Sequence, residues 1–308
     1  MSASPIADRL AHRLQWEDLD RSAVGELARI ARREDLEGWG LAHPPGLTGD
    51  VTSQALRSGE KVASACLVAR EPLVVCGLPL VPLVLGCYGA GASFKPAGRD
   101  GEACPRNAVL GELHGPVRIL LEAERVLLNF LQKLSGVASL TRRYVDAMGA
   151  TPTRLLDTRK TTPGFRVLEK YAVACGGGFN HRIGLFDRVM LKDNHLAAEG
   201  AAGGAALAGL VESTRKQWPD MVIELEVDRL EQIGPALSAG IDVLLLDNFT
   251  PEKLRLAVQQ VGQRAATEAS GGITLESLPG LASLGLDFIS TGATVHQATW
   301  KDIALDWN

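Results

Sequence analysis

From about residue 154 onward, the chain alternates short apolar runs with segments of helical length. The apolar runs are Arg154–Leu156, Val189–Leu191, Val222–Val227, Val243–Leu246, Ala265–Ala269 and Leu286–Ser290. The longer segments between them include Phe165–Cys175, Ala205–Trp218, Leu230–Ala239, Pro251–Gly262 and Leu275–Leu284. Strands that are regularly followed by helices predict a parallel sheet, and this many units with few long insertions predict an α/β barrel.

Each predicted strand ends in, or is directly followed by, a charged or small polar group. These groups are Asp157–Lys160, Lys192–His195, Glu226, Asp247–Asn248, Ser270–Gly272 and Thr291–Ala293. One such residue after a strand is a common helix N-cap, but six strands that end this way make coincidence a poor explanation. Because the carboxyl ends of barrel strands converge on one face, the pattern predicts a shared active site there.

The first part of the chain mixes element types. Leu19–Leu36 has helical spacing, and Val62–Ala69 is predicted to be a strand. Leu73–Phe94 carries no charge and is long enough to cross a bilayer, but its prolines and glycines favour a buried strand-turn-helix segment instead. Val117–Met148 is predicted to be a long helical region, with a break at Gly136.

The charge distribution indicates the kind of ligand. The 308 residues carry a net charge of −4, which disfavours nucleic acid or an anionic membrane as a partner. Residues 154–195 nevertheless contain eight Lys or Arg residues against four acids. A basic cluster in an acidic chain indicates a small polyanionic substrate. The cations beside strand ends or glycine turns are Arg159, Lys160, Arg182 and Lys192.

The later strand ends add phosphate-binding and acidic groups. Backbone N–H groups of the turns Ser270–Gly272 and Thr291–Ala293 could bind a phosphate, since barrels often place such a site after their last strands. Glu226 and Asp247 could bind a divalent metal, hold ribose hydroxyls or stabilise a developing cation. The chain contains no G-x-x-x-x-G-K-[ST] or G-x-G-x-x-G motif. The residues alone therefore predict a barrel enzyme that acts on a phosphorylated, anionic small molecule.

Five cysteines without a C-x-x-C pair predict reduced thiols, and the first ten residues show no signal-peptide pattern. Together these features predict a cytoplasmic protein.

Nine segments carry a family resemblance. They are Gly49–Thr52, Glu124–Asn129, Asp157–Gly164, Glu169–Ala172, Gly176–Gly178, His181–Arg182, Lys192–His195, Leu245–Phe249 and Glu268–Ile273. The D-T-R-K-T-T-P-G and K-D-N-H blocks are long and specific. On these segments, from about residue 34 to residue 298, the chain resembles the quinolinate phosphoribosyltransferases, also called nicotinate-nucleotide pyrophosphorylases (carboxylating).

The resemblance implies a fold and an assembly. We expect an N-terminal α/β sandwich domain at residues 1–124, with residues 294–308 packed back on it. An incomplete, open α/β barrel of the TIM type would follow at residues 125–293 and carry the catalytic site. The resemblance also implies a homodimer or a larger assembly of the same chain.

The resemblance further implies a reaction. The phosphoribosyl group of phosphoribosyl pyrophosphate would pass to quinolinate with decarboxylation, giving nicotinate mononucleotide, CO2 and pyrophosphate in NAD biosynthesis. Mg²⁺ would be the cofactor, with no nucleic acid or membrane as a partner.

Residue roles follow from the matching positions. The resemblance assigns the quinolinate carboxylates to Arg159, His181, Arg182 and Lys192, with Arg125 entering from the neighbouring subunit. The pyrophosphate would face Lys160 and Lys192, while the ribose and its Mg²⁺ would be held by Glu226 and Asp247. The remaining substrate-binding residues would be Thr158, Ser270, Gly271, Gly272, Thr291, Gly292 and Ala293. Catalysis itself is expected of Lys160, Lys192, Glu226 and Asp247.

Three alternatives remain open on the sequence. One is a paralogue of the same fold associated with molybdate transport, which the joint presence of Arg125, Arg159, His181 and Arg182 disfavours. Another is a Schiff-base aldolase that uses Lys192. The last is a non-catalytic module that binds phosphoribosyl pyrophosphate.

Overall fold

The computed structural model describes residues 5–44, 46–56, 59–201 and 204–307. Contacts divide the chain into two compact units. The barrel unit comprises Met1–Arg13, Thr141–Thr162 and Gly178–Gln297, and the sheet unit comprises Leu14–Leu140, Pro163–Gly177 and Ala298–Asn308. The domain limits expected from the sequence, 1–124 and 125–293, stay a prediction.

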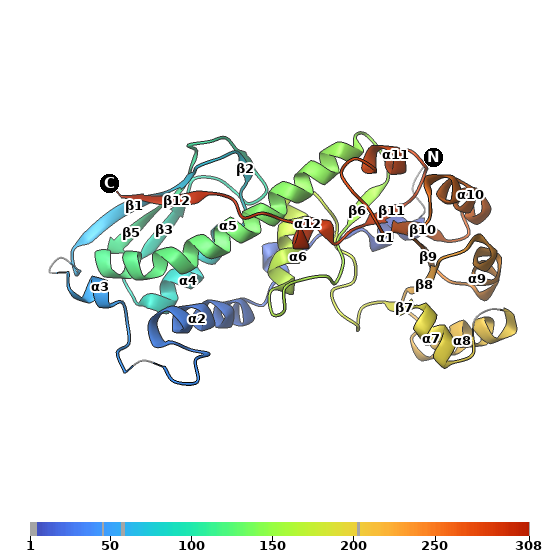
Figure 1. Ribbon diagram of the computed structural model, residues 1–308, viewed down its shortest axis with the longest axis horizontal. Helices are drawn as coiled ribbons and strands as arrows, with labels where there is room; N and C mark the ends of the chain where they lie inside the picture. The colour runs from blue at the N-terminus through green and yellow to red at the C-terminus, as the bar shows by residue number, and fades with distance from the viewer. Residues whose placement is uncertain (1–4, 45, 57–58, 202–203, 308) are drawn as a thin grey trace. The chain divides into compact units, whose positions relative to one another are not determined.

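A parallel six-stranded sheet forms the centre of the barrel unit, in the order β6-β11-β10-β9-β8-β7 (Figure 1). The strands are β6 (Arg154–Leu156), β7 (Val189–Leu191), β8 (Ile223–Val227), β9 (Val243–Asp247), β10 (Ala266–Ser270) and β11 (Phe288–Ser290). Within the described residues, β6 and β7 are the two edges of this sheet, so the barrel does not close. The open α/β barrel expected from the sequence is therefore confirmed.

Helices follow the strands, as the alternating pattern predicts. They are α7 (Asp193–Ala198), α8 (Gly204–Gln217), the 3-10 helix η3 (Leu230–Gln232), α9 (Ile233–Ala239), α10 (Pro251–Val261), α11 (Leu278–Ala282) and α12 (Ala293–His296). Figure 1 shows α8, α9, α10 and α11 along the outer side of the arc of strands. The strands β8, β9 and β10 are buried over most of their length, because one face packs on these helices and the other faces the barrel interior.

A short N-terminal helix, α1 (Pro5–Leu10), covers the amino ends of the barrel strands. Buried residues on α1 pack in one cluster with residues near the starts of β8, β9, β10 and β11 and with Leu156 of β6; the cluster is Ala7, Leu10, Leu156, Val222, Val243, Ala266 and Phe288. Arg154 fixes the helix by donating a hydrogen bond to the Ala7 carbonyl at 2.7 Å and forming an ion pair with Asp8. The amino end of the barrel is thus filled by apolar side chains, which leaves the carboxyl ends of the strands for chemistry.

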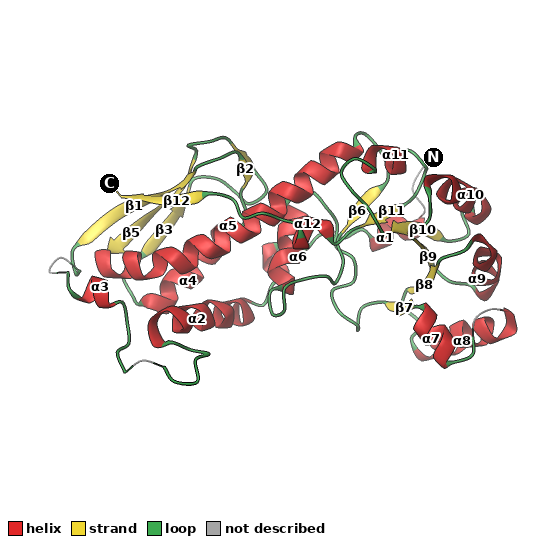
Figure 2. Ribbon diagram, in the orientation of Figure 1, coloured by secondary structure: helices red, strands yellow, loops and turns green. Residues whose placement is uncertain are grey.

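An antiparallel four-stranded sheet organises the sheet unit, in the order β12-β1-β5-β3 (Figure 2). Its strands are β1 (Val62–Ala69), β3 (Ser93–Pro96), β5 (Val109–Pro116) and β12 (Ile303–Trp307), and a separate pair is formed by β2 (Leu73–Val74) and β4 (Ala103–Cys104). The helices are η1 (Trp16–Asp18), α2 (Arg21–Glu37), α3 (Val51–Gln54), η2 (Leu78–Leu80), α4 (Val81–Tyr88), α5 (Val117–Met148) and α6 (Arg166–Cys175).

The uncharged stretch Leu73–Phe94 folds as a strand, a 3-10 turn and the helix α4, as expected. Its side chains Val84 and Leu85 are buried. Among the described residues, no helix combines the length and hydrophobicity needed to cross a membrane.

Helix α5 runs without interruption from Val117 to Met148, so the expected break at Gly136 is wrong. Glycine is needed there for another reason. A Cβ at Gly136 would collide with the backbone carbonyl of Thr299, and it would lie 3.3 Å from the Cα of Trp300. The absent side chain therefore lets the C-terminal segment cross directly over the helix, while the buried side chains around it hold the helix together.

Candidate active site

A cavity of about 630 Å³ opens at the carboxyl ends of the barrel strands. It is lined by residues that lie within or just after the strands β6 to β11 and by the turn after α6; these are Thr158, Arg159, Lys160, His181, Arg182, Met190, Lys192, Glu226, Leu245, Asp247, Asn248, Glu268, Ser270, Gly271, Gly272 and Ser290. Eleven residues in this set were candidates from the sequence. The structure therefore brings these eleven candidates together in one cavity, and their roles stay a prediction.

Two guanidinium groups, those of Arg159 and Arg182, line one part of the cavity. Arg182 is buried, and burial together with the nearby charge of Arg159 lowers its pKa. The Nε atom of Arg159 is itself buried and has no hydrogen-bond partner within the described chain. Two like charges with an unused donor form a site that an anion stabilises, since a carboxylate would relieve their repulsion and accept their hydrogen bonds.

Lysines and carboxylates meet on the adjacent part of the cavity wall. Lys192, at the start of α7, forms an ion pair with Glu226 from β8. Asp247 ends β9, and its pKa is raised by burial and by the negative charge of Glu226. Lys160 and Lys192 lower the pKa of Asp247, so both ammonium groups act on this carboxylate. The wall thus places two positive and two negative groups where a polar substrate would be bound.

The two carboxylates fit a magnesium ion chemically. Glu226 and Asp247 offer hard oxygen ligands, and the raised pKa of Asp247 reflects burial first and then the repulsion from Glu226, which a cation would relieve. Magnesium in such sites is usually held by one or two carboxylates plus substrate phosphates and water. Asn248, which donates a hydrogen bond to Asp247 at 2.7 Å, keeps that side chain in place.

The glycine turn after β10 lies in the cavity. Gly271 has a φ of +92°, and a Cβ there would collide with the side chain of Asn248, so only glycine fits. The turn after β11 differs: Thr291, Gly292 and Ala293 are buried and are not among the residues that line the cavity. A Cβ at Gly292 would lie 2.9 Å from the Cδ of Lys160, so this turn packs against that lysine stem.

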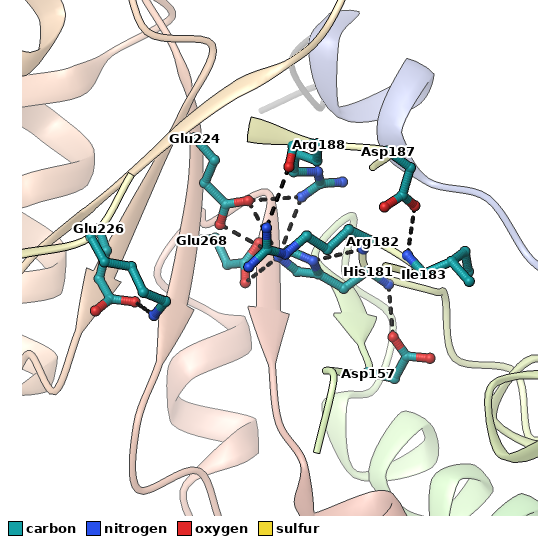
Figure 3. A network of polar contacts seen from close by, with 10 residues as sticks. Asp157, His181, Arg182, Ile183, Asp187, Arg188, Glu224, Glu226 and Glu268 are labelled. Carbon is teal, nitrogen blue, oxygen red and sulfur yellow. Dashed lines mark hydrogen bonds and ion pairs between the residues drawn. The ribbon is translucent and has the colours of Figure 1, made fainter. Parts of the chain in front are cut away.

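His181 and Arg182 enter the cavity from the turn that follows α6. Buried Asp157 shapes this turn by accepting a hydrogen bond from the His181 backbone N–H at 2.8 Å and another from the Asn180 side chain at 2.7 Å. Asp187 accepts a hydrogen bond from the backbone N–H of Ile183 at 2.6 Å (Figure 3), and another from the backbone N–H of Gly184 at 3.1 Å. The chain is therefore fixed on both sides of the two site residues.

Several cavity residues were missed by the sequence interpretation: Met190, Leu245, Glu268 and Ser290. Glu268 is fully buried inside β10, so it does not stand out as a strand-end group. The signal that could have found it is its place two residues before Ser270, on the same face of the strand.

Arg125 is an exposed residue of α5 in the sheet unit and is not among the residues that line the cavity. Its expected entry into the site of a neighbouring subunit stays a prediction.

An open α/β barrel with a cationic cavity, two lysines and two carboxylates at its strand ends defines an enzyme class that handles phosphorylated anions. Two family models match the chain: quinolinate phosphoribosyl transferase, N-terminal domain, at residues 50–135, and the C-terminal domain of the same family at residues 137–306. The chain belongs to the quinolinate phosphoribosyl transferase family.

Similar proteins are found in several bacteria. The probable nicotinate-nucleotide pyrophosphorylase [carboxylating] of Bacillus subtilis is 41% identical over 84% of this chain and 88% of its own length. The nicotinate-nucleotide pyrophosphorylase [carboxylating] of Mycobacterium leprae is 38% identical over 94% of this chain and 99% of its own length. The solved structure of the nicotinate-nucleotide pyrophosphorylase from Francisella tularensis is 37% identical and superposes with a TM-score of 0.86 over 94% of this chain and 98% of that one.

Proposed function

We propose that this protein transfers the phosphoribosyl group of phosphoribosyl pyrophosphate to quinolinate and decarboxylates the product, giving nicotinate mononucleotide, CO2 and pyrophosphate for NAD biosynthesis. The observation that carries the proposal is the cavity of this family member. One part of the cavity holds the paired arginines Arg159 and Arg182, and another part holds the lysines and carboxylates described above. The arginine pair suits an anion with two adjacent carboxylates, and the lysines and carboxylates suit a sugar that carries a charged leaving group.

Arg159 and Arg182 would hold quinolinate by its carboxylates. Their side chains have few competing contacts: Arg182 donates one long hydrogen bond, of 3.4 Å, to the Arg188 carbonyl. Binding through two guanidinium groups fixes the pyridine ring in the plane needed for its nitrogen to reach the sugar. The turn after β10 and, on the sequence resemblance, the turn after β11 would receive the 5′-phosphate.

In the first chemical step, the pyridine nitrogen forms a bond to C1 of the ribose while the bond from C1 to the pyrophosphate oxygen breaks and its electron pair leaves with pyrophosphate. Lys160 and Lys192 would neutralise the leaving group. Glu226 and Asp247 would stabilise the positive charge that develops on the ribose. Magnesium held by these two carboxylates and the substrate would supply further neutralisation of the pyrophosphate.

In the second step, the bond between C2 of the ring and its carboxylate breaks, and CO2 leaves. The electron pair stays on C2, next to the positively charged ring nitrogen, and a proton from water completes the product. Loss of the carboxylate becomes feasible only after the ring nitrogen has gained its charge. The contribution of the protein here is to hold the ring in position rather than to transfer protons.

Release of CO2 from quinolinate labelled in its 2-carboxyl group tests the function. We expect release only when both phosphoribosyl pyrophosphate and Mg²⁺ are present. Lys192→Ala should abolish it, whereas Lys216→Ala, on the exposed side of α8, should leave it unchanged. Absence of release from folded wild-type protein would refute the proposed reaction and favour a paralogue or a binding module.

We also propose a cytoplasmic homodimer in which Arg125 enters the site of the neighbouring subunit. The five free cysteines support a reducing compartment. Mixing two inactive variants, Arg125→Ala and Lys192→Ala, tests the shared site, because a hybrid dimer regains one intact site and a one-to-one mixture should recover about a quarter of wild-type activity. No recovery after subunit exchange would place Arg125 outside the site.

A further inference from the structure

Two thiols that the proposed reaction does not use face each other in the sheet unit. Cys76 lies between β2 and η2, and Cys175 is the last residue of α6. Their Sγ atoms and one carboxylate oxygen of Asp100 all lie within 4.8 Å of one another. Cys76 is 0% exposed, whereas Cys175 is partly exposed. Two sulfur atoms that are far apart in the sequence therefore lie close together, and one of them is open to solvent.

The surrounding backbone holds the two thiols in this arrangement. The Gly101 N–H donates a hydrogen bond to the Val75 carbonyl at 2.8 Å, and the Cys76 N–H donates to Ser135 Oγ at 3.1 Å. A Cβ at Gly101 would lie 3.1 Å from the Cys175 carbonyl oxygen, so the same loop packs directly against the end of α6. Because the native fold already brings the two side chains together, a reaction between them needs little further ordering of the chain.

The pair differs from Cys87 in its hydrogen bonding. Cys87 Sγ, in the same unit, donates to the Leu83 carbonyl at 3.3 Å. Within the part of the chain that the structure describes, the thiols of Cys76 and Cys175 donate to no backbone carbonyl and face each other instead. Burial raises the pKa of the Cys76 thiol, and Cys175 and Asp100 raise it further. Oxidation therefore gives up no stabilised thiolate at Cys76, which favours a disulfide.

A metal ion is the other partner that two thiols and a carboxylate suggest. Asp100, however, already accepts hydrogen bonds from the backbone N–H groups of Gly77, at 2.8 Å, and Leu78, at 3.0 Å. The Tyr171 hydroxyl donates to the same carboxylate at 2.9 Å, so three of its roughly four lone-pair sites are in use. Two thiolates and a carboxylate would also give a divalent ion a net negative charge in a largely buried place. A disulfide is neutral and leaves the hydrogen bonds of Asp100 intact.

We propose that Cys76 and Cys175 are a modification site, which forms an intramolecular disulfide by exchange with a low-molecular-weight disulfide. The bond joins the end of α6 covalently to the segment that follows β2. In a reducing cytoplasm the two side chains stay thiols, and the link forms when the small thiols of the cell become oxidised.

The exchange takes place in two steps. Cys175 reacts first, because its side chain is the accessible one. It loses its proton, its sulfur bonds to one sulfur of the small disulfide, and the S–S bond of that molecule breaks and releases a small thiolate. Cys76 then loses its proton, and its sulfur bonds to the Cys175 sulfur and expels the second small thiolate. The two small thiolates take up the two protons, so the cysteines are oxidised by two electrons and the small disulfide is reduced.

The new bond should stabilise the folded chain. The whole of α5 lies between Cys76 and Cys175 in the sequence, so the bond closes a long loop. Closing a long loop lowers the conformational entropy of the unfolded chain. The oxidised protein should therefore unfold at a higher urea concentration than the reduced protein, and reduction should restore the lower midpoint.

Mass spectrometry of unreduced peptides tests the pairing. The whole protein is equilibrated with oxidised glutathione under native conditions, and the remaining thiols are then alkylated. We expect a disulfide between Cys76 and Cys175 that dithiothreitol reverses, and no protein disulfide at Cys66, Cys87 or Cys104. Cys87→Ser changes a partly exposed thiol in the same unit, so it is the matched control and should leave the link unchanged.

Two variants separate this pair from a general effect of oxidation. In Cys76→Ser, Cys175 should keep one glutathione as a mixed disulfide, because the second thiol is missing. In Cys175→Ser, Cys76 should stay a thiol. Circular dichroism establishes that each variant is folded, and neither should show the rise in urea midpoint that oxidation gives the wild type. The wild-type link is measured without them, so the test holds if one variant does not fold.

Four results would overturn the proposal. They are a mixed disulfide that persists on Cys175 in the wild type, a protein disulfide with a different pairing, a urea midpoint that oxidation leaves unchanged, and tightly bound zinc in the isolated wild-type protein that both variants lose. The last result would assign the same side chains to a metal site instead.

Discussion

Replacing Arg182 with alanine should weaken the binding of quinolinate selectively. The residue is 9% exposed and lies beside Arg159, so little water can take over its role when the side chain is removed. A hydrogen-bonded contact between charged groups contributes about 2–3 kcal/mol, which corresponds to a loss of about 30- to 150-fold in quinolinate affinity. Binding of phosphoribosyl pyrophosphate should change by less than about threefold, because the lysine–carboxylate wall is untouched.

Titration calorimetry of each ligand with the wild type and Arg182→Ala measures both affinities. Arg229→Ala is the control, since that side chain is 69% exposed and lies outside the cavity. Circular dichroism and the urea midpoint establish that the variant is folded. Equal losses for quinolinate and phosphoribosyl pyrophosphate would refute the assignment of Arg182 to the dicarboxylate.

Three further results are expected. In steady-state kinetics, Glu226→Gln and Asp247→Asn should each lower kcat by a larger factor than they change KM, because charge develops on the ribose only in the transition state. A change confined to KM would show that both residues only bind the substrate. Phe288→Ala should lower the free energy of unfolding by about 3–5 kcal/mol in urea denaturation, since a fully buried ring packs against α1. Leu256→Ala, at an exposed position, should cost less than about 0.5 kcal/mol, and equal effects of these two changes would contradict the packing argument. Chelation of divalent ions should abolish CO2 release, and Mg²⁺ should restore it; activity that persists in excess chelator would rule out the metal.

The barrel could be predicted closely because its signal is local. The expected strands Arg154–Leu156 and Val189–Leu191 have the observed bounds, and short apolar runs between helical segments leave few alternative folds. The residues that follow these strands also converge as expected, because parallel strands point their carboxyl ends to one side.

The deeper layer of the cavity was not predicted, because the strand-end pattern contains only the last residues of each strand and those that follow it. This layer lies two residues earlier on each strand: Met190 before Lys192, Leu245 before Asp247 and Glu268 before Ser270. Side chains two residues apart share a face of a strand, so the sequence does contain this information. What it lacks is the pairing of Glu268 with His181, since that depends on how the turn after α6 folds over the sheet.

Gly136 is a residue whose role the sequence could not predict. Glycine inside a helical pattern suggests a break on local propensity, and the true reason is a chain crossing by Thr299. No local rule contains that contact. A similar long-range cause places Gly271 beside Asn248.

The pairing of β1 with β12 has a consequence for how the protein is made. One neighbour of β1, β5, follows it closely in the chain, whereas β12 is synthesised long after both strands. At bacterial and eukaryotic rates of synthesis, the delay between these two strands is on the order of 10–40 s. During that time the unpaired edge of β1 is open to other strands. In newly made chains this strand edge is therefore exposed for that time, and a ribosome-associated chaperone could cover it. A truncated mRNA would give a product without β12, and the open edge of β1 would make that product prone to aggregation.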